Sequence, residues 1–167
     1  MDATFKILSG DGKEFTTTEA AARQSQTISN LLEVASVDEP IALDTIHSVD
    51  LAEIIKYCEY FAKLAENPSA VSEKDVMEWQ QAFIKNVTAD KDQHLRMLQA
   101  ADSLIIPSLF KLLIRSLVAK LHNKTAPQIR EEWDIIDDLD DNEKKEIFES
   151  TSWLRAPTTA PDSSSSA

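Results

Sequence analysis

The sequence predicts an α+β protein that is mainly helical, with one small sheet close to its N-terminus. An alternating segment at residues 4–8 and an extended segment at 14–16 flank a short turn, which is the pattern of a β-hairpin. Apolar residues at helical spacing dominate the chain after residue 19. Both glycines of the chain lie in this turn, so the remaining backbone favours helices with few tight turns.

The next elements complete a small sheet and begin the helical part. A short helix is expected over residues 19–23. A second helix carries apolar residues from Ile28 to Ala35, with Ser25 or Thr27 as its N-cap. Residues 40–43 are apolar and extended in character, which predicts a third strand.

Residues 50–65 form the first long helix that the sequence predicts. One face of it is apolar, with Leu51, Ile54, Ile55, Cys58, Phe61, Ala62 and Ala65. Because Cys58 lies within this stripe, we interpret it as a small core residue rather than a reactive thiol.

A loop over residues 67–74 separates this helix from three more. The first covers residues 75–87 and the second residues 90–104; the third begins at Pro107 and ends near residue 122. In the second of these helices, the expected buried side contains Leu95, Leu98, Ala101 and Ile105.

The helix that begins at Pro107 is apolar over an unusually wide arc. The apolar positions are Leu109, Phe110, Leu112, Leu113, Ile114, Leu117, Val118 and Leu121. A helix that packs once against a domain needs a stripe of only about 100°. Two surfaces must therefore be covered: either both lie inside the same domain, or one binds another protein.

Two short helices are expected after residue 123. Thr125 with Gln128, and Asp140 with Glu143, have the spacing of capping boxes. Such short helices are not stable alone in water, so they must dock on something. Trp133 and Trp153 are the large side chains available for this, either within the chain or at a protein interface.

These elements divide the chain into five segments. Residues 1–66 form an α/β part and residues 67–74 a loop. Residues 75–122 are helices that complete the first domain and begin a binding surface, and residues 123–155 are the C-terminal binding helices. Residues 156–167 are rich in Ser, Pro and Thr, which predicts a disordered tail.

The composition restricts the function classes. With 17 basic and 29 acidic residues, the formal net charge is −12, which argues against nucleic acid or a membrane surface as a partner. The single cysteine excludes an intrachain disulfide, and no signal peptide or membrane-spanning run is visible. We expect a cytoplasmic or nuclear protein.

No catalytic constellation is recognisable, so we expect a protein that is not an enzyme and needs no cofactor or metal. The three histidines are scattered, and a glycine-rich phosphate loop cannot form with two glycines in one hairpin. The acidic run at residues 137–141 lacks the glycine and terminal glutamate of a calcium loop.

The order of these segments resembles the Skp adaptors of SCF ubiquitin ligases. Residues 5–15 look like the opening hairpin of that family, and residues 22–33 like the helix that follows. Residues 54–58 are similar to its third helix. Trp79–Ile84 is similar to its Trp-Asp-x-x-Phe segment, and Ala100–Ile106 to its Ala-Ala-Asn-Tyr-Leu-Asp-Ile motif. Further matches near the C-terminus are Asn123–Thr125, Ile129–Arg130, Asp134–Ile135 and Ser152–Trp153.

The resemblance implies a BTB/POZ-like N-terminal domain followed by helices that bind F-box proteins. It places the F-box-binding residues at Leu109, Leu113, Leu117, Leu121, Ile129, Trp133, Ile135 and Trp153. It places the contact with a cullin at Asp102 and Ser103, where the family has Asn-Tyr. Loss of that aromatic side chain alters the expected cullin contact.

The leading hypothesis is therefore an adaptor that bridges F-box substrate receptors to a cullin for ubiquitin-dependent degradation. The alternative is a self-associating structural protein that uses the same helical surface to form a homodimer when no F-box protein is bound.

Overall fold

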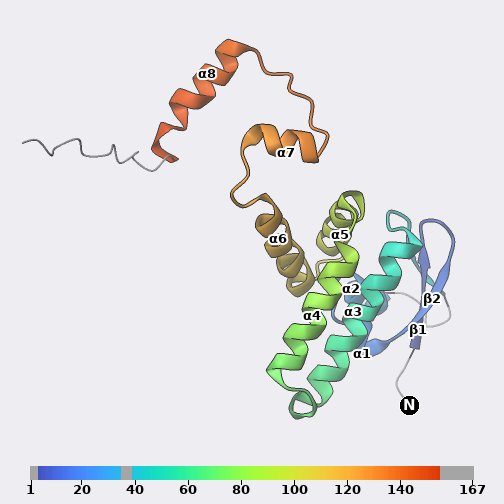
Figure 1. The fold of residues 1–167 in the computed structure, drawn as a ribbon. Coiled ribbons are helices and arrows are strands. Elements are labelled where there is room, and N and C mark those ends of the chain that lie inside the picture. The colour runs from blue at the N-terminus through green and yellow to red at the C-terminus, as the bar shows by residue number, and fades with distance from the viewer. Residues whose placement is uncertain (1–3, 35–38, 155–167) are drawn as a thin grey trace, which may run out of the picture. The chain divides into compact units, whose positions relative to one another are not determined.

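The computed structural model describes residues 4–34 and 39–154 (Figure 1). Contacts within the chain divide it into two compact units, residues 1–123 and residues 124–167. We call these unit 1 and unit 2. The division follows Asn123, next to the predicted start of the C-terminal helices at residue 123. The predicted tail lies outside the described residues.

The sheet of unit 1 contains three strands in the order β2-β1-β3. Strand β1 (Thr4–Ser9) pairs antiparallel with β2 (Glu14–Thr18), which sets Ile7 opposite Phe15. Strand β3 (Ile41–Leu43) runs parallel to β1 at its other edge. The predicted hairpin and third strand are confirmed. Ile7 is fully buried, as the alternation in β1 requires.

The hairpin turn packs against the segment that leads from β3 into α3 (Ser48–Glu66). The amide of Gly10 donates to the carbonyl of Ile46 at 2.9 Å. A Cβ atom on Gly10 would lie 2.0 Å from the carbonyl oxygen of Asp44, so only glycine fits at this position. Gly12 has a different role, because its φ of +81° is a backbone conformation that glycine adopts at little cost.

Helices α1 (Glu19–Ala22) and α2 (Gln26–Val34) follow the hairpin. The hydroxyl of Ser25 accepts a hydrogen bond from the amide of Ile28 at 3.1 Å and donates to the carbonyl of Leu104 at 2.5 Å. Of the two caps considered for α2, Ser25 is therefore the one in use, and it also ties α2 to a distant part of the chain.

Three more helices complete unit 1. These are α4 (Glu73–Val87), α5 (Lys91–Ser103) and α6 (Pro107–Leu121). A short 3₁₀ helix, η1 (Pro68–Ala70), occupies part of the predicted loop, and α4 begins two residues earlier than predicted. In Figure 1, α3 lies between the sheet on one side and α4 and α5 on the other.

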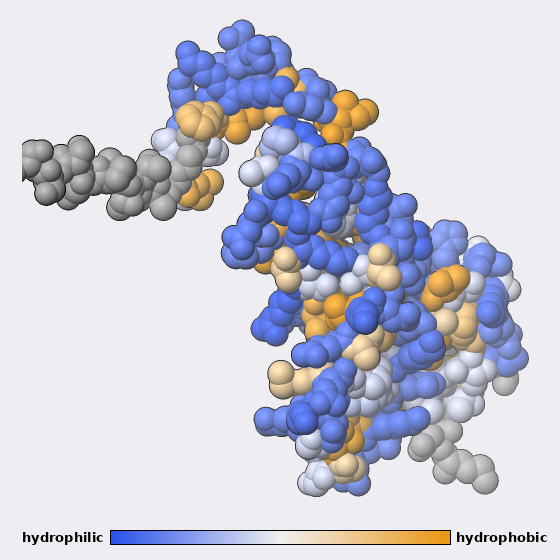
Figure 2. Space-filling model, viewed as in Figure 1, coloured by the Kyte–Doolittle hydropathy of each residue, from blue (hydrophilic) through white to orange (hydrophobic). Residues whose placement is uncertain are grey.

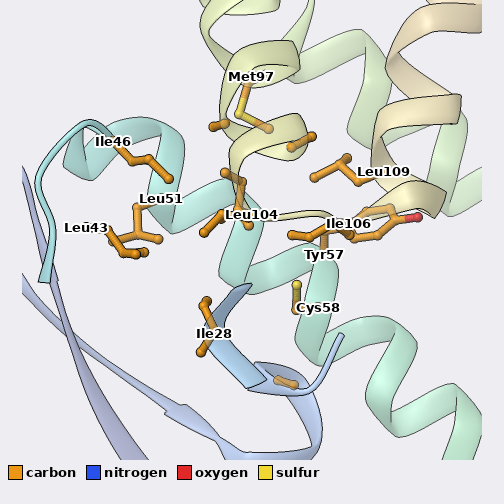
Figure 3. Close-up of a cluster of buried hydrophobic side chains, with 14 of the residues drawn as sticks. Ile28, Leu43, Ile46, Leu51, Tyr57, Cys58, Met97, Leu104, Ile106 and Leu109 are labelled. Atoms are coloured by element: carbon orange, nitrogen blue, oxygen red, sulfur yellow. The ribbon is translucent and has the colours of Figure 1, made fainter. Parts of the chain in front are cut away.

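The core of unit 1 forms where these helices meet the inner face of the sheet. Figure 3 shows side chains from α2, β3, α3, α5 and α6 gathered around one centre. Its labelled members are Ile28, Leu43, Ile46, Leu51, Tyr57, Cys58, Met97, Leu104, Ile106 and Leu109. The predicted stripe of α3 is largely confirmed, but Ala65 is exposed and Tyr57 is buried instead.

The buried side of α5 differs from the prediction. Leu98 and Ala101 are buried as expected, whereas Leu95 is 41% exposed and Ile105 is 51% exposed. His94 and Met97 are fully buried in their place. The observed stripe has the i, i+3, i+4, i+7 spacing, but it begins at His94, a polar residue that the apolar pattern did not include. Ile105 lies beyond the end of α5, so helical spacing does not apply to it.

Unit 2 contains α7 (Ala126–Glu132), α8 (Asp141–Ser150) and a short 3₁₀ helix, η2 (Ser152–Leu154). Both helices begin with the predicted capping boxes. None of the residues in these three elements is classed as fully buried.

Candidate protein-binding surfaces

The wide apolar arc of α6 is only partly used inside unit 1. Phe110, Leu112, Ile114 and Leu117 pack against the core while remaining partly accessible, and Val118 is 58% exposed. Leu121, at the end of the helix, is also half-buried. Unit 1 therefore covers one side of the arc, while the other side retains accessible apolar surface.

Leu109 and Leu113 belong to the core side of α6. Each is fully buried, with no exposed area. The resemblance placed both in the F-box-binding set, but unit 1 itself encloses both side chains, and neither has exposed area for a partner in this structure. They share the i, i+4 row with Leu117 and Leu121, and spacing alone does not distinguish the inner end of that row from its accessible end.

Several large apolar side chains of unit 2 are exposed at its surface. The most exposed are Ile135 (52%), Ile136 (82%), Ile147 (48%), Phe148 (63%), Trp153 (78%) and Leu154 (64%). In Figure 2, hydrophobic side chains line one edge of this unit, while hydrophilic side chains cover most of the side in view. We call these six residues the unit 2 apolar set.

Of the eight predicted F-box-binding residues, only Ile135 and Trp153 are members of the unit 2 apolar set. Four others, Leu117, Leu121, Ile129 and Trp133, are half-buried. The sequence analysis did not assign Ile136, Ile147, Phe148 or Leu154 to the site. The signal for them was available: apolar residues in or beside helices that are too short to bury them.

A carboxylate joins the two helices of unit 2. Asp137, in the connection between α7 and α8, lies 3.0 Å from Lys144 Nζ and 3.7 Å from Arg130 Nη2. The hydrogen bond from Lys144, together with the positive charge of Arg130, holds the pKa of Asp137 below its usual value. This arrangement links the basic side chains of α7 and α8 through one residue, although all three groups are accessible to solvent and to screening by salt.

The residues expected to contact a cullin are the last two of α5, directly before the turn that leads into α6. Asp102 and Ser103 are both exposed. The carbonyl of Ser103 accepts a hydrogen bond from the hydroxyl of Thr27 at 2.8 Å, which ties the turn to α2. Asp102 and Ser103 also line a polar pocket of about 480 Å³ between the β3–α3 connection and α5.

An ion pair forms one wall of this pocket. Asp50 is 2% exposed, and its Oδ2 accepts from Arg96 Nε at 2.9 Å. The hydrogen bond that Arg96 donates to the Asp50 carboxylate raises the pKa of the guanidinium. Asp50 Oδ1 has no hydrogen-bond donor among the described residues. A buried acceptor without a donor is uncommon in folded proteins.

The one cysteine of the chain, Cys58, is buried in the core of unit 1. Burial raises the pKa of the Cys58 thiol to about 12, so the thiol is protonated at neutral pH and suits a core position. In the part of the chain that the structure describes, no group of three His, Cys, Asp or Glu side chains is placed to hold a metal ion. Within the same residues, no helix combines the length and hydrophobicity needed to span a bilayer.

Comparison with known proteins gives one consistent family. Residues 3–63 match the Skp1 family, tetramerisation domain. SKP1-like protein 12 of Arabidopsis thaliana is 30% identical over 147 residues, which cover 88% of this chain and 93% of that relative. SKP1-like protein 9 of the same plant is 32% identical over 154 residues, covering 90% and 97%. SKP1-like protein 1 of Oryza sativa subsp. japonica is 28% identical over 162 residues, covering 88% and 92%.

These matches agree with the observed fold. The three-stranded sheet, the helices packed beside it and the family match over residues 3–63 confirm the predicted mainly helical, BTB/POZ-like architecture. The identity of about 30% extends over nearly the whole chain, so the relationship is not restricted to one segment. The chain belongs to the Skp1 family as a diverged member.

Proposed function

We propose that this chain is the adaptor subunit of an SCF-type cullin-RING ubiquitin ligase, and that it bridges F-box substrate receptors to a cullin. Members of the Skp1 family are adaptors rather than enzymes, and the adaptor role in SCF complexes is a property of that family. The adaptor acts by positioning: one surface binds the substrate receptor and another binds the cullin. The proposed location is the cytoplasm or the nucleus.

The unit 2 apolar set is the observation that carries this proposal. Ile136, Trp153 and Leu154 are each more than 60% exposed, although apolar side chains of this size are stabilised by burial. Clusters of such residues mark protein interfaces, and tryptophan is enriched among the residues that dominate binding energy. A helical partner that covers this set, together with the accessible side of α6, accounts for their exposure.

The proposed F-box-binding residues are the unit 2 apolar set together with the half-buried Leu117, Leu121, Ile129 and Trp133. Trp133 supports this choice, because its Nε1 is buried and has no acceptor among the described residues. A partner that reorders this region and supplies an acceptor would remove that cost.

Binding to a purified F-box segment tests the F-box assignment. Titration calorimetry should give tight binding for the wild-type chain, and Trp133→Ala or Leu117→Asp should abolish it while unit 1 stays folded by circular dichroism. The matched control is Val49→Ala, since Val49 is 63% exposed on α3 of unit 1. Wild-type affinity in the Trp133→Ala and Leu117→Asp variants would refute the assignment.

The cullin contact is proposed at Asp102 and Ser103 on unit 1. Both side chains are exposed at the α5–α6 turn, and neither is part of the core. Ser103→Tyr should strengthen binding to the N-terminal region of a cullin, because an aromatic side chain adds buried apolar area at the contact. Equal affinities of the Ser103→Tyr variant and the wild type would argue against this location.

The same exposed apolar surface favours one alternative, a homodimer formed in the absence of an F-box protein. Sedimentation of the pure chain over a range of concentrations separates the two. An adaptor should be monomeric, or should form a dimer that dissociates when an F-box segment is added. A dimer that resists the F-box segment would favour a structural role outside ubiquitination.

A further inference from the structure

The turn between α5 and α6 holds a strained isoleucine. Ile105 has a φ of 49°, in the left-handed region that glycine adopts readily and β-branched residues adopt at a cost. The turn closes α5 in the usual way for this conformation: the amide of Ile106 donates to the carbonyl of Ala101 at 2.9 Å. Glycine would make the same turn without strain.

Burial within the chain does not compensate for this strain. The Ile105 side chain is 51% exposed, whereas Leu104 and Ile106 on either side of it are each 1% exposed. Ile105 is therefore both strained and accessible: its backbone conformation costs stability, and its half-exposed side chain recovers little of that cost by burial. Strained residues with exposed side chains are a reason to look for a binding role.

Two hollows of different character flank this position. The first, of about 200 Å³, is mainly apolar, and its lining residues are Ala101, Asp102, Ile105, Ile106, Pro107 and Phe110. The second is the polar pocket of about 480 Å³ described above. Asp102 lines both hollows, so a partner that covers the turn meets an apolar surface and an acidic one side by side.

The charges of the polar pocket favour a cation. Its walls contain the carboxylates of Asp50 and Asp102 and one guanidinium, Arg96, which Asp50 already pairs with at 2.9 Å. Asp50 Oδ1 is buried without a donor among the described residues. The exposed carboxylate of Asp102 is the group that an incoming N–H donor can reach, whereas an anion would face both carboxylates. The net charge of −12 adds long-range attraction for a basic surface.

We infer that the α5–α6 turn is a two-part docking site, in which Ile105 contacts an apolar side chain and Asp102 with the polar pocket binds a neighbouring lysine or arginine of the same partner protein. This rests on the proposed function, under which the partner at this end of unit 1 is a cullin. Ile105 then supplies apolar contact area next to Ser103, where the family's aromatic residue is missing.

Ile105→Gly tests the apolar half, because stability and binding should change in opposite directions. Relief of backbone strain should raise Tm by about 2–4 °C. Loss of the side chain should weaken binding to the cullin N-terminal region by about tenfold. A merely structural residue would lower both. Leu95→Ala is the control: Leu95, on α5, is another exposed aliphatic residue (41%), and its substitution should change affinity by less than about twofold.

Asp102→Asn tests the proposed contact between Asp102 and a lysine or arginine of the partner. It should weaken cullin binding by about fivefold at low salt and make the affinity less dependent on ionic strength. Asp92→Asn is the matched control, because it removes the same charge from the exposed first turn of α5. If the two substitutions weaken binding equally, Asp102 contributes only the long-range attraction that any acidic residue provides. That result would overturn this half of the inference.

The outcomes separate this inference from the function it rests on. Wild-type cullin affinity in the Ile105→Gly variant, or a fall in Tm, would overturn the docking site and leave the adaptor role intact. Stronger binding by Asp102→Asn would overturn the cationic assignment, since it would indicate an acidic partner group facing Arg96. A wild-type chain that binds F-box segments but no cullin would overturn both the docking site and the bridging function.

Discussion

The carboxylate of Asp11, in the β1–β2 turn, binds Ser48 at the first turn of α3. Its Oδ1 accepts from the Ser48 amide at 2.8 Å, and its Oδ2 accepts from the Ser48 hydroxyl at 2.6 Å. His47, the N-cap of α3, makes no side-chain capping bond. A residue 37 positions earlier in the chain therefore provides the negative charge and the acceptor that helix N-termini favour.

Asp11→Asn should lower the stability of unit 1, because the amide loses the charge and one of two acceptor oxygens. Hydrogen bonds from Ser48 and Ser9 hold the pKa of Asp11 well below its usual value. A lowered carboxyl pKa adds stability that is fully present above the unfolded pKa near 3.8 and is lost as pH falls toward the folded value. The Tm difference between wild type and Asp11→Asn should therefore be largest at neutral pH and shrink below about pH 4.

A control for this prediction is Asp44→Asn, an exposed aspartate in the β3–α3 connection. Thermal unfolding at pH 7 and pH 3 should show little difference between this variant and wild type. If the Tm difference between wild type and Asp11→Asn stays constant from pH 7 to pH 3, the charge of the carboxylate does not contribute to the stability that Asp11 provides.

The two glycines of the hairpin turn should respond differently to alanine. At Gly10 the new methyl group would lie 2.0 Å from a backbone oxygen, so the turn must move away from the β3–α3 connection. We expect a loss of about 3 kcal/mol in the free energy of unfolding. Gly12 has open space around it but a φ of +81°, so Gly12→Ala should cost about 1 kcal/mol.

Urea unfolding of the two alanine variants, followed by circular dichroism, provides the comparison. Equal losses would show that backbone conformation dominates at both positions and that the close approach at Gly10 relaxes cheaply.

The sequence was sufficient for elements whose signals are local. Hairpin alternation, both capping boxes of unit 2 and the helix that begins at Pro107 depend on residues a few positions apart, and all were recovered. The failures concern tertiary environment. Whether His94 is buried or Leu95 exposed depends on which face of α5 meets α6. The depth of Leu113 depends on packing across unit 1. The pocket at Asp50 joins residues about 50 positions apart, which no local pattern reports.

Burial of His94 should make stability depend on pH. Its Nε2 lies 3.1 Å from the carbonyl oxygen of Leu113, so Nε2 carries the proton, and Nδ1 has no partner among the described residues. Protonation of Nδ1 would bury a charge, and this burial lowers the pKa of His94 below 6.5. Since the unfolded chain then binds the proton first, stability should be full above pH 6.5 and fall as pH decreases below it.

The slope of this fall can reach about 1.4 kcal/mol per pH unit for one proton. Urea unfolding between pH 7.5 and 5.5 measures it, and His94→Leu should reduce the slope. His122→Leu is the control, because His122 is exposed at the end of α6 and should leave the slope unchanged. A slope that survives in His94→Leu would assign the pH dependence to other groups.

Substitution of Leu113 should affect mainly stability, and substitution of Trp153 should affect mainly F-box binding. Leu113 is fully buried, so Leu113→Ala leaves a cavity and should cost about 3 kcal/mol of unfolding free energy. Trp153 is 78% exposed, so Trp153→Ala should change stability by less than about 0.5 kcal/mol. Under the proposed function, the effects on binding are reversed: Trp153→Ala should weaken F-box binding by more than about tenfold, and folded Leu113→Ala should bind almost as wild type does.

Paired measurements on the same preparations, urea unfolding for stability and calorimetry for F-box binding, give both quantities for each variant. Leu113 belongs to unit 1 and Trp153 to unit 2, so the two variants test one side chain in each unit. Normal binding by Trp153→Ala would remove η2 from the proposed surface. A large stability loss in that variant would mean that the tryptophan packs against its own chain in solution, and the apolar surface that requires a second protein would then be smaller than the structure indicates.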